Sequence, residues 1–218
     1  MGVYRHLTNF LRHHAVMLLC VSSGGLALSG AIINGPLGLV YFRGLLTLLI
    51  LACINFGQGE LPRHWQRWLL ELVSAVVLVA TWSQATLQPL GLVLYSIYLT
   101  SITAGTIHRL IRQKQVNREL LAAGVAGYLL IGLCGFFLSL TLLSFDSQAF
   151  LEGGMPLPET SGESLLYYSF VTLSTLGYGD IVPGNPLARS LTVLLTSLGQ
   201  VYTTVVLGLL LARYLHER

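Results

Sequence analysis

Six long apolar stretches, separated by short polar segments, constrain this chain more than any other feature of its sequence. They run over residues 15–33, 36–56, 68–87, 89–107, 120–143 and 187–211. Each is close to the roughly 20 residues that a helix needs to cross a bilayer. Hydrophobic residues make up 54% of the 218 residues and charged residues only 10%, which is typical of a polytopic membrane protein. The sequence therefore predicts an all-α membrane protein with six transmembrane helices.

Charged residues are distributed unevenly over the segments that connect these stretches. If the amino terminus lies in the cytoplasm, ten of the twelve basic residues fall on the cytoplasmic side, and only Arg43 and Arg189 do not. The acidic residues between the fifth and sixth stretches then lie outside: Asp146, Glu152, Glu159, Glu163 and Asp180. This distribution satisfies the positive-inside rule, so both termini are predicted to be cytoplasmic. The net charge of +3 is too small to indicate a nucleic-acid partner.

The segment between the fifth and sixth stretches contains Thr172-Leu173-Ser174-Thr175-Leu176-Gly177-Tyr178-Gly179-Asp180. Residues 163–172, which lead into it, form a short apolar run typical of a helix. Gly177 and Gly179 are expected where the backbone needs φ > 0, a conformation that most L-residues avoid. Gly-Tyr-Gly-Asp would also suit a surface turn. Its position between two spanning stretches disfavours that interpretation.

This stretch resembles the selectivity-filter loop of the tetrameric pore-loop potassium channels, whose pattern is Thr-x-x-Thr-x-Gly-Tyr-Gly-Asp. Residues 120–211 as a whole resemble the pore module of that family, as found in small bacterial six-helix members. The resemblance implies that K⁺ is coordinated by four consecutive backbone carbonyls and one hydroxyl, namely those of Thr175, Leu176, Gly177 and Tyr178 and of the Thr175 side chain. It implies further that Gly179 and Asp180 support this filter.

The same resemblance implies an architecture. A re-entrant pore helix and the filter loop would lie between the fifth and sixth helices, and four chains would surround one pore as a homotetramer. The chain would then divide into a four-helix transmembrane domain at residues 1–107, a basic cytoplasmic linker at residues 108–119 and a pore domain at residues 120–218. The expected location is the cell membrane, as a multi-pass protein of the bacterial inner membrane.

Three residues outside the filter have expected roles that the sequence leaves open. Tyr167 and Tyr168 would form an aromatic cuff that supports the filter, but tyrosines are also common where a membrane meets water. Gly199 lies where the inner helices of the family have a hinge. Glycine also permits close packing of membrane helices, so hinge and packing both remain open for Gly199.

The sequence as a whole predicts a passive potassium channel whose partners are K⁺, the lipid bilayer and other copies of the chain. The fourth stretch, residues 89–107, contains no Arg or Lys, so steep voltage gating is not expected. A non-conducting scaffold or regulatory subunit with a pore-like fold is the alternative. An active transporter subunit fits less well, because the chain has one Gly-Tyr-Gly. No catalytic constellation, metal-ligand spacing or cofactor motif is visible, so an enzyme is not expected.

Overall fold

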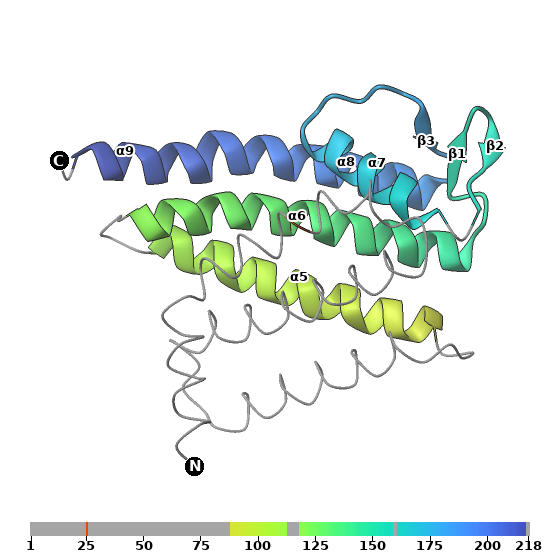
Figure 1. The fold of residues 1–218 in the computed structure, drawn as a ribbon, viewed down its shortest axis with the longest axis horizontal. Helices are drawn as coiled ribbons and strands as arrows, with labels where there is room; N and C mark the ends of the chain where they lie inside the picture. Colours follow the sequence, from red (N-terminus) through yellow and green to blue (C-terminus); the bar gives the residue numbers. More distant parts are fainter. Residues whose placement is uncertain (1–24, 26–87, 113–117, 159–160, 217–218) are drawn as a thin grey trace, which may run out of the picture.

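The structure, a computed structural model, describes residues 25, 88–112, 118–158 and 161–216 (Figure 1). The first three apolar stretches, at residues 15–33, 36–56 and 68–87, lie outside the described residues apart from Gly25. The predicted count of six helices is therefore tested only for the fourth, fifth and sixth stretches.

Three helices of the described chain are long and apolar enough to cross a membrane. They are α5 (Gln88–Arg112), α6 (Arg118–Phe145) and an inner helix from Pro186 to His216, composed of α8 (Pro186–Val201), the π-helical turn η2 (Tyr202–Leu207) and α9 (Gly208–His216). They correspond to the fourth, fifth and sixth predicted stretches, and each extends beyond its predicted ends. Because α5 continues to Arg112 and α6 begins at Arg118, both ends of the segment expected as a linker are helical.

The inner helix begins at a local sequence signal. The Asn185 side chain accepts a hydrogen bond from the backbone N–H of Ala188 at 2.7 Å, which satisfies one of the free donors at the helix start. Pro186 occupies the first turn, where its missing N–H costs nothing and its fixed φ suits a helix. Asn185 and Pro186 therefore set the position at which α8 starts.

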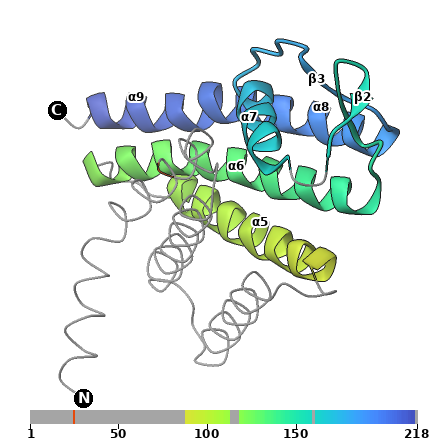
Figure 2. The same ribbon diagram turned by 45° about the vertical axis from the view of Figure 1, so that its right-hand side comes forward.

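Helices α5 and α6 lie side by side and run in opposite directions (Figures 1 and 2). The rings of Tyr95 on α5 and Phe137 on α6 have centroids 4.2 Å apart, and the hydroxyl oxygens of Ser96 and Thr141 are 3.1 Å apart. Tyr95 and Phe137 belong to one buried cluster that also contains residues of α7. Thus α5, which the sequence assigned to a separate four-helix domain, packs against the α6 of its own chain.

A short helix, α7 (Gly162–Leu173), lies between the ends of α6 and α8 (Figure 1). Its buried face includes Leu165 and Leu166, which are 0% and 2% exposed. The Ser169 hydroxyl donates to the backbone carbonyl of Gly132 on α6 at 2.6 Å. With 12 residues, α7 is shorter than the roughly 20 residues that a helix needs to cross a bilayer. It packs instead against α6 and α8.

The prediction of an all-α fold is wrong in one respect, because the chain also contains a small antiparallel sheet. Its strands are β1 (Phe150–Glu152), β2 (Met155–Pro156) and β3 (Ile181–Pro183), in the order β2-β1-β3. The β1–β2 hairpin lies between α6 and α7, whereas β3 follows the glycine-rich loop. Strands this short show no readable alternation, and the pairing of β1 with β3 joins distant parts of the sequence. The protein is therefore mostly helical with a three-stranded sheet.

Charged residues separate to the two ends of the helices. Asp146, Glu152 and Asp180 lie at the end that carries the sheet, whereas Arg112 and Arg213 lie near the opposite ends of α5 and α9 (Figure 1). The Arg213 guanidinium donates to the backbone carbonyl of Ile111 at 3.1 Å. Arg189, in the first turn of α8, is a basic residue at the acidic end. Which of the two ends lies outside the cell stays a prediction.

Candidate functional site

The glycine-rich loop that follows α7 is tied to the end of that helix by its backbone N–H groups. The N–H of Thr175 donates to the Thr172 carbonyl at 3.0 Å, and the N–H groups of Leu176 and Gly177 donate to the Val171 carbonyl at 3.0 and 3.4 Å. Among the backbone hydrogen bonds of the described residues, none is accepted by the carbonyls of residues 175–178. The loop therefore directs its donors towards α7 and leaves a row of acceptor oxygens free.

The backbone of this loop alternates in handedness. Thr175, Gly177 and Gly179 have φ values of 62°, 55° and 82°, whereas the residues between them have negative φ. Successive carbonyls of a regular strand point to opposite sides, and a left-handed residue at every second position turns them to the same side. The positive φ expected at Gly177 and Gly179 is present.

Thr175 was expected in this row, but its positive φ was not predicted from the sequence. A β-branched residue at positive φ is a genuine outlier, and such backbone strain costs roughly 1–3 kcal/mol. Strain of this kind persists only where the surrounding structure fixes it. The only available signal was the second Thr of the pattern, which was read for its hydroxyl and carbonyl and not for its backbone.

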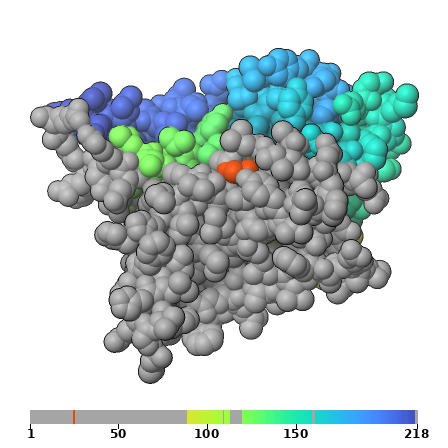
Figure 3. Space-filling model, in the orientation of Figure 1, coloured from red at the N-terminus to blue at the C-terminus, as the bar shows by residue number. Residues whose placement is uncertain are grey.

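Every residue from Ser174 to Asp180 is exposed in the single chain. Leu176 and Tyr178 are 59% and 68% exposed, and the loop forms part of the upper surface in the space-filling view (Figure 3). Irregular backbone at membrane depth is tolerated only where protein covers it or where it lines a cavity filled with water. At membrane depth, a loop this exposed would need either cover from further protein or a water-filled cavity.

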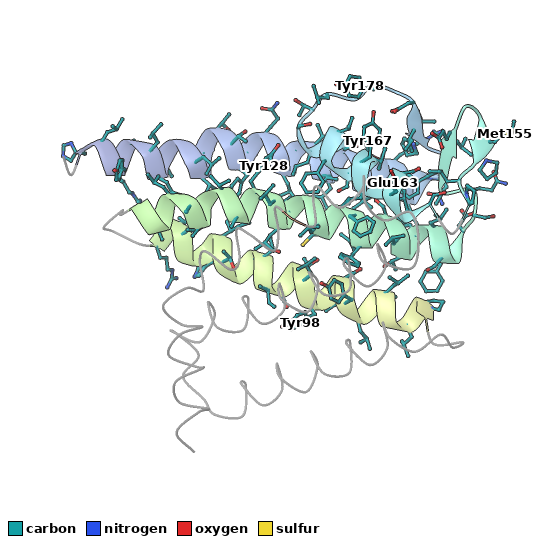
Figure 4. All side chains as sticks on the ribbon, in the orientation of Figure 1. Tyr98, Tyr128, Met155, Glu163, Tyr167 and Tyr178 are labelled. Atoms are coloured by element: carbon teal, nitrogen blue, oxygen red, sulfur yellow. The ribbon has the colours of Figure 1, made fainter. Side chains whose placement is uncertain are left out.

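The two tyrosines expected to support the loop have different surroundings. Tyr167 lies beneath the loop that carries Tyr178 (Figure 4), and its hydroxyl donates a hydrogen bond to the Asp180 carboxylate. That bond lowers the pKa of Asp180 and raises the pKa of Tyr167 to about 12, so Asp180 carries its negative charge at neutral pH.

Tyr168, in contrast, does not reach the loop. Its side chain is 5% exposed, its hydroxyl oxygen is 2.5 Å from that of Thr192 on α8, and its ring packs edge-on against Phe150 of β1 with centroids 5.1 Å apart. Of the expected cuff, Tyr167 touches the loop directly, whereas Tyr168 holds the sheet and the inner helix together.

Sequence comparison indicates which known family part of this chain resembles. Residues 123–215, from α6 to α9, match a family model described as "Ion channel". The match covers less than half of the chain, and we call this segment, which is similar to that family, the ion channel module. Together with the three described helices that are long and apolar enough to cross a membrane, this similarity points to a multi-pass membrane protein.

A known potassium channel is similar to a short part of the chain. Two-pore potassium channel 4 of Arabidopsis thaliana is 48% identical over 42 residues, which cover 19% of this chain and 15% of the relative. The match thus spans a small part of that protein's length. No solved structure matches the chain significantly.

The inner helix of the ion channel module passes close behind the loop. The Gln200 side-chain amide lies 3.4 Å from the Thr175 hydroxyl oxygen, at the inner end of the row of carbonyls. Gly199 is buried, and a Cβ added to it would collide with the backbone carbonyl oxygen of Leu173 at the end of α7. The structure therefore gives Gly199 a packing role, and its role as a hinge stays a prediction.

A substitution separates packing from hinge motion at Gly199. Gly199→Ala is expected to lower the thermal unfolding temperature of the purified protein by several degrees, because overpacking against backbone costs about 1–3 kcal/mol. Gly208→Ala is the matched control, since a Cβ there meets nothing within 4 Å on the same inner helix. Equal unfolding temperatures for the two variants, together with an altered open probability in Gly199→Ala alone, would favour the hinge.

Proposed function

We propose that the chain forms a potassium-selective channel that conducts K⁺ passively across the membrane. The observation that carries this proposal is the row of free carbonyls at residues 175–178, produced by left-handed backbone at Thr175 and Gly177. Potassium leaves its hydration shell only where fixed oxygens replace it, and rings of backbone carbonyls do this in potassium channels. The Arabidopsis relative is named as a potassium channel, which supports the same ion.

Each residue of the loop takes a role in this proposal. The carbonyls of Thr175, Leu176, Gly177 and Tyr178 and the Thr175 hydroxyl coordinate K⁺, with Gly179 and Asp180 at the outer end. The negative charge of Asp180, held ionised by its bond to Tyr167, raises the local concentration of cations at the entrance. The carboxyl end of α7 adds negative potential at the inner end of the row.

The same proposal requires several copies of the chain. One loop offers a single carbonyl at each level and cannot surround an ion, whereas four copies around an axis form rings of four. Such a ring also covers the loop backbone that is exposed in one chain. We therefore propose that the chain assembles as a homotetramer in the bacterial cell membrane, with both termini in the cytoplasm.

The charges of α5 bear on gating by voltage. From Gln88 to Ile107 this helix has no Arg or Lys, and its two basic residues, Arg109 and Arg112, fall in its last turn. Because each charge that crosses the field contributes about 2.3 kcal/mol per 100 mV, a helix without charges in its length supplies little voltage dependence. The proposed channel therefore has no steep voltage threshold.

Recordings from purified protein in planar bilayers test this function. With K⁺ on one side and Na⁺ on the other, the reversal potential should lie far from zero, with the K⁺ side negative, and conductance should change gradually with voltage. Equal permeability to K⁺ and Na⁺ would contradict the filter assignment. A complete lack of conductance in correctly assembled protein would favour the non-conducting scaffold.

A further inference from the structure

A network of hydrogen bonds joins the end of α6 to the start of the inner helix, beside the outer end of the filter loop. The Asn185 side-chain amide donates to Asp146 Oδ2 at 2.6 Å, and Asp146 Oδ1 accepts from the Gln148 backbone N–H at 2.9 Å. Asn185 Oδ1 in turn accepts from the Ala188 N–H. Both oxygens of Asp146 and both polar atoms of Asn185 are thus used.

Backbone pairing extends this network towards the filter. The Gly184 N–H donates to the Ala149 carbonyl at 2.8 Å, and β1 pairs with β3 so that Leu151 faces Val182 and Glu152 faces Ile181. We call residues 146–152 together with residues 181–185 the outer bracket. The second segment of the bracket begins at Ile181, directly after Asp180, the last residue of the filter loop.

The bracket rests on buried side chains. Phe150 of β1 is 0% exposed and Ile181 of β3 is 5% exposed, and the Phe150 ring packs against Tyr168 of α7. The filter loop is therefore fixed at both ends, by α7 at the inner end and by the bracket at the outer end. Between these ends its side chains are exposed in the single chain.

Fixation at both ends matters because the loop is strained. Thr175 has a φ of 62°, and a loop free at either end would relax to negative φ there and turn its carbonyl away. A shift of the outer end would also move the Gly177 and Tyr178 carbonyls, which lie only a few residues before β3. The position of β3 therefore bears on the geometry of the carbonyl row.

We propose that Asp146 and Asn185 are a positioning pair for ion selectivity, which hold β3 and thereby the outer end of the filter at the spacing that K⁺ requires. The pair touches no ion and acts through the outer bracket. This inference rests on the proposed potassium channel function. The hydrogen bond to Asn185 also lowers the pKa of Asp146, so the carboxylate is ionised and the bond is charge-assisted at neutral pH.

Two single variants remove the bond in different ways. Asn185→Ser keeps an oxygen that can cap α8 but loses the amide that reaches Asp146, and it should lower the K⁺/Na⁺ permeability ratio by about tenfold. Asn185→Asp sets two carboxylates against each other and should lower the ratio at least as much. Glu163→Gln is the charge control, since it removes an exposed outer carboxylate that is not in the bracket.

A reciprocal exchange tests the pair itself. In the double variant Asp146→Asn with Asn185→Asp, the amide at position 146 can donate to the carboxylate at position 185. The remaining oxygens can still accept from the N–H groups of Gln148 and Ala188. The double variant should restore the permeability ratio to within about twofold of the wild type, because it forms the bond again with the two residues exchanged.

All variants are measured as purified protein in planar bilayers, after native mass measurement has shown the same assembly as the wild type. If Asn185→Asp does not assemble, Asn185→Ser and the double variant carry the test. Wild-type selectivity in assembled Asn185→Ser would overturn the proposal, as would a double variant as impaired as Asn185→Asp. A wild type that does not select K⁺ would contradict the proposed function instead, so the two failures are distinguishable.

Discussion

Replacing Gly177 with alanine is expected to abolish potassium flux. Gly177 has a φ of +55°, and a Cβ added there would meet no atom within 4 Å in the single chain, so the expected effect is not steric. The left-handed conformation costs an L-residue about 1–2 kcal/mol, which becomes about 4–8 kcal/mol when four chains form one ring. A loop that relaxes to negative φ turns its carbonyl away from the row and opens the oxygen ring.

Gly153→Ala is the matched control for this substitution. Gly153 lies in the turn between β1 and β2, has a φ of +58°, and also has open space around an added Cβ. The backbone penalty is therefore nearly the same, but it falls outside the row of carbonyls. Efflux of K⁺ from liposomes should be lost in Gly177→Ala and retained in Gly153→Ala. Equal loss in both variants would show that flux reports general stability and not the filter.

Native mass measurement in mild detergent is expected to show four chains of 23.7 kDa in one particle. In a single chain all residues from Ser174 to Asp180 are exposed, including backbone that the bilayer cannot solvate. Each unsatisfied polar group in hydrocarbon costs several kcal/mol, so the loop favours burial between copies of the chain. A closed ring of four achieves this burial and completes the oxygen shell around K⁺.

The thermal stability of the particle in K⁺ and in Na⁺ shows whether the chains assemble through the filter or only through their apolar helices. A ligand that binds only the assembled state stabilises it by mass action, so the particle should withstand more heat in K⁺ than in Na⁺. Gly177→Ala should reduce this difference, and Gly153→Ala should preserve it. A monomer or dimer that still carries K⁺ flux would contradict the mechanism, because fewer loops do not close a ring.

The amino-acid sequence alone identified the parts of the fold that depend on local properties. Apolar length predicted α5, α6 and the inner helix, because a bilayer needs about 20 apolar residues whatever their partners. The glycine-rich loop was predicted for a similar reason, since Gly177 and Gly179 permit a backbone that other residues avoid. Asn185 and Pro186 are local signals of the same kind, although the start of α8 was not predicted from them.

The tertiary structure alone decided the contacts between distant segments. Asp146 and Asn185 lie 39 residues apart, β1 pairs with β3 across α7 and the filter loop, and Tyr168 turns towards Thr192 while Tyr167 turns towards Asp180. Strands of two or three residues carry no period, and identical neighbouring tyrosines carry no signal of direction. The position of Thr175 at positive φ also depends on the anchors at both ends of the loop. Such features arise because packing of remote residues offsets local strain, and a local pattern does not contain that information.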